Sequence, residues 1–164
     1  MSTTSQPAAV ALSVVVVNWN GAAYLGACLD AARGGGRELI VVDNASRDGS
    51  AALLRERHPD VRLLANDANV GFARAANRGL REARGRYVLF LNPDAIVSDQ
   101  AIAAALATLE RRPEVGLVGV AQRDGQGHVL PTVEPFFSLA ALRRPSHRRL
   151  SAPAGPGPVA IDWC

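Results

Sequence analysis

Short runs of strand-forming residues alternate with helical patterns over most of the chain. Tyr87 to Leu91 is apolar without alternation, which is typical of a strand that is covered on both faces in a parallel sheet. We expect strands at 13–17, 38–42, 61–65 and 87–91. We expect helices over about 22–32, 51–57, 72–84 and 99–112. Strands that alternate with helices in this way predict an α/β domain of three layers, with a mostly parallel central sheet.

The helical patterns also predict which side chains face the sheet. In the first helix these are Tyr24, Leu25, Cys28, Leu29 and Ala32. In the third helix they are Ala76, Leu80 and Ala83.

The pattern weakens towards the end of the sequence. We expect a fifth strand at 116–121, a turn at 124–127 and a short strand at 128–130, whereas 131–164 is rich in proline, glycine and arginine. We therefore interpret 1–12 as a flexible tail and 13–130 as the folded domain. Residues 131–164 are interpreted as a loop or linker that leads towards a part this sequence does not contain, so the fold is expected to be incomplete at its C-terminus.

Composition excludes several classes of protein. All 18 basic residues are arginines, and the net charge of +3 is too small and too evenly spread to indicate a nucleic-acid partner. The two cysteines, Cys28 and Cys164, have no metal-ligand or disulfide spacing. Neither a membrane-spanning run nor a signal peptide with a cleavage site is recognisable.

Polar side chains follow three of the predicted strands at the points where these strands end. Because the carboxyl ends of parallel strands meet at one edge of a sheet, these side chains are expected to converge there. They are Asn18 and Asn20, then Asp43 and Asn44, and finally Asn92 and Asp94.

The residue types at this edge indicate a nucleotide and a cation. A carboxylate that ends the second strand, Asp43, suits hydrogen bonding to a ribose or a base. The first turn, 18–21, lacks the glycine-rich phosphate cradle of dinucleotide-binding and methyl-transfer enzymes, which disfavours both classes. A divalent cation on Asp94 is then the simplest partner for a diphosphate. The alternative is that 92–94 is only a turn.

Four segments of the chain resemble the inverting glycosyltransferases of family two, which have the GT-A fold. The segments are 16–20, 40–50, 69–79 and 87–94, in the order and at the spacing typical of the family. The resemblance implies transfer of a sugar from a nucleotide-diphosphate donor, with inversion at the anomeric carbon and with Mg²⁺ or Mn²⁺. Asn92 stands where most members have the first carboxylate of the metal motif, as in a branch similar to rhamnosyltransferases.

The resemblance also implies a set of site residues. Asp94 is the expected metal ligand. The expected contacts of the donor nucleotide are Asn18, Asn20, Asp43, Asn44, Asn69, Gly71, Asn77 and Asn92. Many relatives carry an arginine where this chain has Ala76, and whether Arg74 replaces that arginine is left open.

A catalytic base cannot be named from this sequence. An inverting transfer needs a general base, which the family supplies from a position that would lie beyond Cys164. Asp99 is better interpreted as a helix-start acid, Asp124 as part of a turn, and Asp162 lies in a segment that cannot be placed. The expected acceptor is a glycan or a lipid-linked molecule. The predicted location is the cytoplasm, and the arginines of 143–149 leave peripheral association with the inner face of the membrane open.

A second function is compatible with the same residues. The chain could be a nucleotide-binding or truncated module without a catalytic base, which would bind a nucleotide without turnover. Sugar transfer by this chain would rule that alternative out.

Overall fold

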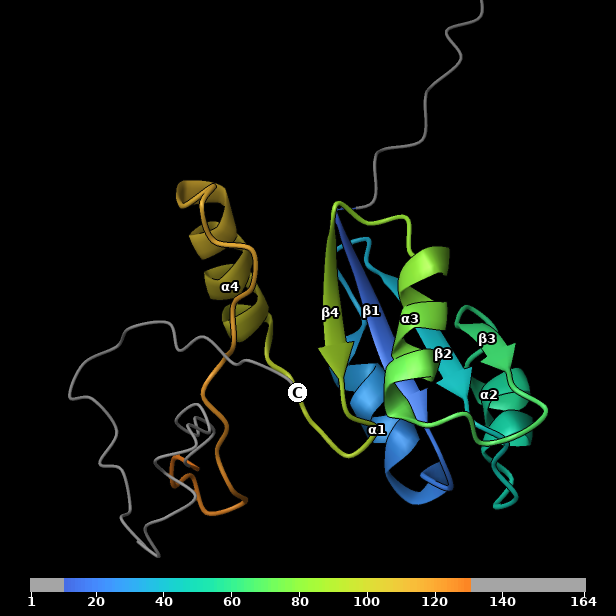
Figure 1. Cartoon of the computed structure of the whole chain (residues 1–164). Coiled ribbons are helices and arrows are strands. Elements are labelled where there is room, and N and C mark those ends of the chain that lie inside the picture. The colour runs from blue at the N-terminus through green and yellow to red at the C-terminus, as the bar shows by residue number, and fades with distance from the viewer. Residues whose placement is uncertain (1–10, 131–164) are drawn as a thin grey trace, which may run out of the picture. The chain divides into compact units, whose positions relative to one another are not determined.

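The computed structural model describes residues 11–130, and it divides after Asp99 into two units that are described separately (Figure 1). The strands of the first unit are β1 (Leu12–Asn18), β2 (Glu38–Asp43), β3 (Arg62–Ala65) and β4 (Tyr87–Leu91). Its helices are α1 (Ala22–Ala32), α2 (Ser50–Arg57) and α3 (Phe72–Glu82). The predicted alternation of strands and helices is confirmed, with most boundaries within one or two residues.

The four strands form one parallel sheet in the order β3-β2-β1-β4. β1 lies between β2 and β4, with Asn18 beside Asp43 and Val16 beside Leu91. The first two crossovers run in one direction across the sheet and the third runs back, so right-handed connections place α3 on the face opposite α1 and α2. Figure 1 shows this arrangement, with α3 in front of the sheet. The carboxyl ends of all four strands consequently share one edge.

The core lies between the sheet and the helices, and small residues decide how closely α3 approaches. Val15, Ile40, Val42 and Ala75 form a buried cluster. A Cβ atom built on Gly79 of α3 would lie only 2.4 Å from Cγ1 of Val15. The helix therefore packs directly on the sheet because residue 79 has no side chain.

The prediction that a side chain faces the sheet is wrong for two residues, Tyr24 and Leu80. Tyr24 is 62% exposed, because it lies one residue before the buried row that begins at Leu25. Leu80 is 44% exposed, because the buried face of α3 is made of Ala75, Ala76 and Gly79, whose small size permits the close approach. A large side chain is accommodated only at the margin of that face.

Gly79→Ala should destabilise the protein by about 1–3 kcal/mol, because the new methyl group overpacks a filled site against Val15 and Val42. Gly26→Ala is the matched control. Gly26 also lies within a helix, α1, but an added Cβ would meet only Nε2 of His58 at 3.7 Å. It should leave stability unchanged or raise it by up to about 1 kcal/mol. Urea denaturation of the two variants measures the difference, and equal effects would refute the close packing of α3.

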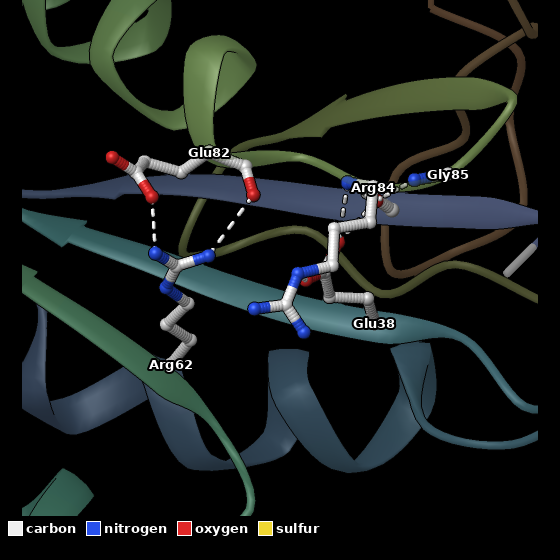
Figure 2. Close-up of polar contacts among 6 residues, drawn as sticks. Glu38, Arg62, Glu82, Arg84 and Gly85 are labelled. Carbon is white, nitrogen blue, oxygen red and sulfur yellow. Dashed lines mark hydrogen bonds and ion pairs between the residues drawn. The ribbon is translucent and has the colours of Figure 1, made fainter. Parts of the chain in front are cut away.

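A polar cluster fixes the connection from α3 to β4 at the amino edge of the sheet, opposite the candidate site. The Ser13 hydroxyl donates to Glu38 Oε2 at 2.6 Å and accepts the backbone N–H of Gly85 at 2.8 Å. Glu38 Oε2 also accepts the backbone N–H of Arg84 at 2.8 Å. Figure 2 shows Glu38, Arg84 and Gly85 of this cluster beside the pair formed by Arg62 and Glu82. These interactions satisfy backbone groups of the crossover and hold β4 in register beside β1.

The second unit contains one helix in its described part, α4 (Asp99–Arg111), which begins at Asp99 as predicted. No strand forms over 116–121 in that part, so the predicted fifth strand is wrong, and the short strand at 128–130 is reduced to an isolated antiparallel bridge between Arg123 and Val129. Gly119 is the one residue of 116–121 that the structure assigns to a β-bridge, so pairing within this run is limited to a single position. The turn at 124–127 is confirmed, since Gly127 N–H donates to the carbonyl of Asp124 at 3.0 Å. The predicted tail at 1–12 is wrong at its end, because Leu12 is buried and begins β1. The rest of that tail, 1–10, and the predicted linker at 131–164 lie outside the described residues.

Candidate functional site

The ends of β1 and β2 are joined by their side chains. Asn18 Nδ2 donates to Asp43 Oδ1 at 2.9 Å, and the backbone N–H of Ser46 donates to Asp43 Oδ2 at 3.1 Å. Asn18 is fully buried, and Asp43 is 3% exposed. Each carboxylate oxygen of Asp43 thus accepts one hydrogen bond from the protein and keeps a lone pair for another donor.

The loops after these two strands are also held to each other. The hydroxyl of Ser46 accepts the backbone N–H of Asn20 at 2.8 Å, and Asn20 Oδ1 accepts the backbone N–H of Arg47 at 2.8 Å. Asn20 and Ala45 have positive φ angles of 54° and 63°. Asparagine tolerates this conformation, whereas alanine adopts it at a cost of about 1 kcal/mol, and such strain concentrates at functional sites.

Asp48 connects the first two helices at their N-termini. Its Oδ2 accepts the backbone N–H of Ala22 at 2.8 Å, and its Oδ1 accepts the backbone N–H of Ser50 at 3.1 Å and the hydroxyl of Ser50 at 2.5 Å. Ala22 and Ser50 are the first residues of α1 and α2. Burial alone would raise the pKa of Asp48, but the hydrogen bonds from Ser50 and Ala22 outweigh it and hold the pKa below its usual value.

Asp48→Asn should reduce stability most at neutral pH. Because the pKa is lowered in the folded protein, the ionised carboxylate stabilises the fold above its unfolded pKa of about 3.9, and this contribution is lost as the pH falls through the folded value. The difference in unfolding free energy between wild type and Asp48→Asn should therefore shrink below about pH 4. Asp67→Asn, at an exposed carboxylate with no hydrogen bond to the described residues, is the control. A difference for Asp48→Asn that stays constant from pH 7 to pH 2.5 would contradict this account.

A third loop, 66–71, is attached to the end of β2 through Asn44. Asn44 Oδ1 accepts from Asn66 Nδ2 and from the backbone N–H of Val70, both at 3.0 Å, and its Nδ2 donates to Asn69 Oδ1 at 2.7 Å. The Asn44 residue is 2% exposed. Gly71 ends this loop at the N-cap of α3 with a φ of 81°, a conformation that favours glycine.

The turn after β4 rests on α1. The backbone N–H of Ala95 donates to the carbonyl of Asn92 at 3.1 Å, and the thiol of Cys28 donates to the same carbonyl at 3.3 Å. A Cβ on Gly21 would lie 3.4 Å from Cβ of Pro93, so this turn packs on the start of α1. Burial raises the pKa of the Cys28 thiol to about 11, and the nearby charge of Asp94 adds to the effect. Cys28 is therefore an un-ionised buried hydrogen-bond donor at neutral pH.

The structure brings most of the predicted site residues to one edge of the sheet. Asn18, Asn20, Asp43, Asn44 and Asn69 are linked directly or through the 43–50 loop. The side chains of Asn77, Asn92 and Asp94 make no hydrogen bond within residues 11–130, and all three residues are exposed. Asp94 stands on the adjoining turn, and no hydrogen bond joins its side chain to that of Asp43.

Sequence reasoning missed the residues that support this edge. Ser46, Asp48, Asn66, Arg78 and Cys28 form its hydrogen bonds but were not predicted to belong to it. Asp48 had a recognisable signal, since it lies in the polar run that follows the second predicted strand. The roles of Cys28 and Arg78 depend on the tertiary fold and leave no local pattern.

The described residues supply few ligands for a metal ion. No group of three or more histidine, cysteine, aspartate or glutamate side chains gathers within 11–130. Asp94 therefore offers a single carboxylate on an exposed turn. Within the same residues, no helix is both long and apolar enough to cross a membrane.

Comparison with known proteins gives a consistent family match. The family model described as Glycosyl transferase family 2 matches residues 13–157. N-acetylglucosaminyl-diphospho-decaprenol L-rhamnosyltransferase of Mycobacterium tuberculosis is 34% identical over an alignment of 112 residues that covers 62% of this chain and 36% of that protein. Poly-beta-1,6-N-acetyl-D-glucosamine synthase of Staphylococcus epidermidis is 27% identical over 84 residues, which are 50% of this chain and 20% of that protein.

Solved structures agree on the fold. TarS of S. aureus, in a structure of its residues 1–349 in complex with UDP, matches with a TM-score of 0.56 and 21% identity over 63% of this chain and 33% of that chain. This likeness confirms the predicted GT-A type of α/β fold. The chain spans about a third of the length of the rhamnosyltransferase that it matches, 36%.

Proposed function

The chain belongs to glycosyl transferase family 2, and we propose that it forms the donor-binding part of an enzyme that transfers a sugar, with inversion, from a nucleotide-diphosphate donor. The observation that carries the proposal is the shared edge of the sheet, where β1, β2 and β4 end in Asn18, in Asp43 and in the turn that holds Asp94. In open α/β sheets ligands bind at this edge.

The proposed roles at this edge follow the hydrogen bonds that each side chain makes, since Asp43, Asn18 and Asn44 are all buried. Asp43 accepts a hydrogen bond from the nucleoside through a remaining lone pair. Asn18 and Asn44 hold Asp43 and the 66–71 loop through their hydrogen bonds, so we assign them to positioning rather than to direct contact. The exposed residues that we propose to border the nucleotide are Asn20, Asn69, Gly71, Asn77 and Asn92.

Asp94 is the proposed ligand of Mg²⁺ or Mn²⁺. One exposed carboxylate does not form a metal cage, but it fits a cation that keeps several of its ligands on substrate phosphates. Such a cation, when bound, neutralises the charge that develops on the leaving nucleoside diphosphate. The contribution of this chain is to fix the turn that presents Asp94, through Cys28 and Gly21 of the α1 region.

The acceptor and the sugar are assigned by class only. A related protein bears a name for rhamnosyl transfer to a lipid-linked diphosphate, which supports a hexosyl or deoxyhexosyl donor and a glycan or lipid-linked acceptor for this chain. We propose residues 13–130 as the nucleotide-sugar-binding domain, acting in the cytoplasm or at the inner face of the membrane.

A nucleotide-binding role without catalysis is the second candidate. Within residues 11–130 no carboxylate stands out as a general base, since Asp99 starts α4 and Asp124 accepts the backbone N–H of Gln126 and of His128 within its turn. Transfer of a sugar to water or to an acceptor by this chain would exclude this candidate, whereas tight binding without turnover would favour it.

A nucleoside diphosphate with Mn²⁺ should raise the melting temperature of the chain. A panel of UDP, dTDP, GDP and ADP, each with and without Mn²⁺, measures the effect by differential scanning fluorimetry. At a ligand concentration 100 times its Kd, the stabilisation should be about 2.7 kcal/mol, which is a shift of several degrees. Asp94→Asn should remove the part that depends on Mn²⁺ and leave the part that depends on the nucleotide alone.

Asp67→Asn serves as the control, because it removes an exposed carboxylate from a loop at the same edge. If none of the four nucleotides shifts the melting temperature of the wild-type chain, the proposed function is refuted. An equal loss of the Mn²⁺ effect in Asp94→Asn and Asp67→Asn would instead refute the role of Asp94.

A further inference from the structure

Three asparagine side chains form a continuous chain of hydrogen bonds between α3 and the candidate site. Arg78 of α3 donates through one terminal nitrogen to the carbonyl of Ala65, at 2.7 Å, and to Asn66 Oδ1. Asn66 Nδ2 donates to Asn44 Oδ1 at 3.0 Å, and Asn44 Nδ2 donates to Asn69 Oδ1 at 2.7 Å. The chain ends at Asn69, which is exposed.

Each amide in this chain can point only one way. A guanidinium and a backbone N–H donate and never accept, so the atom that faces them must be an oxygen. Asn66 faces Arg78, Asn44 faces the N–H of Val70 at 3.0 Å, and Asn69 faces the N–H of Gly71 at 2.9 Å. All three Oδ1 atoms are thereby fixed independently of one another. Rotating any amide by 180° would set two donors against each other.

The fixed orientation of these amides determines which atom of Asn69, the last of the three asparagines, is left for a ligand. The Oδ1 atom of Asn69 accepts from Asn44 and from Gly71, and its Nδ2 atom donates to none of the residues in 11–130. The loop that carries Asn69 is anchored to β2, because the backbone N–H of Asn66 donates to the carbonyl of Asp43 at 2.8 Å. An exposed amide NH₂ group of fixed orientation is thus held at the same sheet edge as Asp43.

We propose that Asn69 Nδ2 donates a hydrogen bond to an acceptor oxygen of the bound nucleoside diphosphate, and that Asn66 and Arg78 are positioning residues for this donor. The inference rests on the proposed function and adds to it an atom, a direction and two supporting residues. An amide NH₂ group suits a phosphate oxygen and also a carbonyl or hydroxyl oxygen of the nucleoside.

Asn69→Asp tests the direction of the hydrogen bond. The aspartate keeps an oxygen for Asn44 and Gly71. Without nucleotide, the variant should therefore have the same midpoint of urea unfolding as the wild type. It replaces the NH₂ group by a charged oxygen, so affinity for the tightest-binding nucleoside diphosphate of the panel should fall at least about tenfold by isothermal titration calorimetry. Gln126→Glu, which adds the same charge at an exposed amide in the second unit, should bind within about twofold of wild type.

The outcomes separate this inference from the proposed function. If the wild-type chain binds no nucleotide of the panel, the proposed function fails and the inference falls with it. If the wild type binds and Asn69→Asp binds equally well, the inference alone is overturned. It is also overturned if Asn69→Asp is markedly less stable, because Oδ1 would then not be the atom that faces Asn44 and Gly71.

A comparison with the corresponding nucleoside monophosphate identifies the acceptor oxygen. A larger loss of affinity for the diphosphate than for the monophosphate assigns the oxygen to the terminal phosphate. Equal losses assign it to the nucleoside or the first phosphate.

Asn66→Asp tests positioning separately from contact. This variant keeps an oxygen for Arg78 but sets a second oxygen against Asn44 Oδ1. The repulsion should disturb the orientation of the Asn44 and Asn69 amides. In nitrogen-15 NMR spectra of the wild type, the side-chain NH₂ signal of Asn69 should shift on nucleotide addition. In Asn66→Asp that signal should already differ without nucleotide and should shift less at equal saturation. An unchanged Asn69 signal and response would show that Asn66 has no positioning role.

Discussion

The parallel pairing of β1 with both β2 and β4 is the constraint on which the rest of this structure depends. Because β1 is central and its two neighbours run in the same direction, the residues that follow all three strands reach one edge of the sheet. Had either neighbour been antiparallel, Asp43 and Asp94 would lie at opposite edges. The side-chain hydrogen bonds at this edge refine an arrangement that the backbone already determines.

The two sides of the edge are supported by different means. On the β2 side, buried amide and carboxylate groups join three loops, and Asn44 satisfies groups from the loop before α3. On the β4 side, the turn lies on α1, whose first residue is in turn held by Asp48 from the β2 side. Helix α1 therefore connects the proposed nucleoside side with the proposed cation side. Buried polar networks of this kind make an arrangement rigid, and among the described residues only Oδ1 of Asn18 is buried without a hydrogen-bond partner.

The sequence was sufficient for the strands, the helices and their polar ends, because hydrophobic periodicity and turn residues are local signals. It was insufficient for the inward face of α3, where the space beside Val15 excludes a side chain at residue 79 and moves Leu80 to the margin. It also failed at 116–121, where the apolar residues predict a strand and the structure has a single β-bridge residue, Gly119. The supporting residues Cys28 and Arg78 act across long sequence separations, which single-sequence patterns do not report.

Paramagnetic broadening by Mn²⁺ tests the central claim most directly. With a bound nucleoside diphosphate and substoichiometric Mn²⁺, the amide NMR signals of 18–21, 43–48, 66–71 and 92–95 should broaden. The signals around Ser13, Glu38 and Gly85, at the opposite edge, should stay sharp. Broadening centred on that opposite edge, or spread evenly over the first unit, would contradict the account.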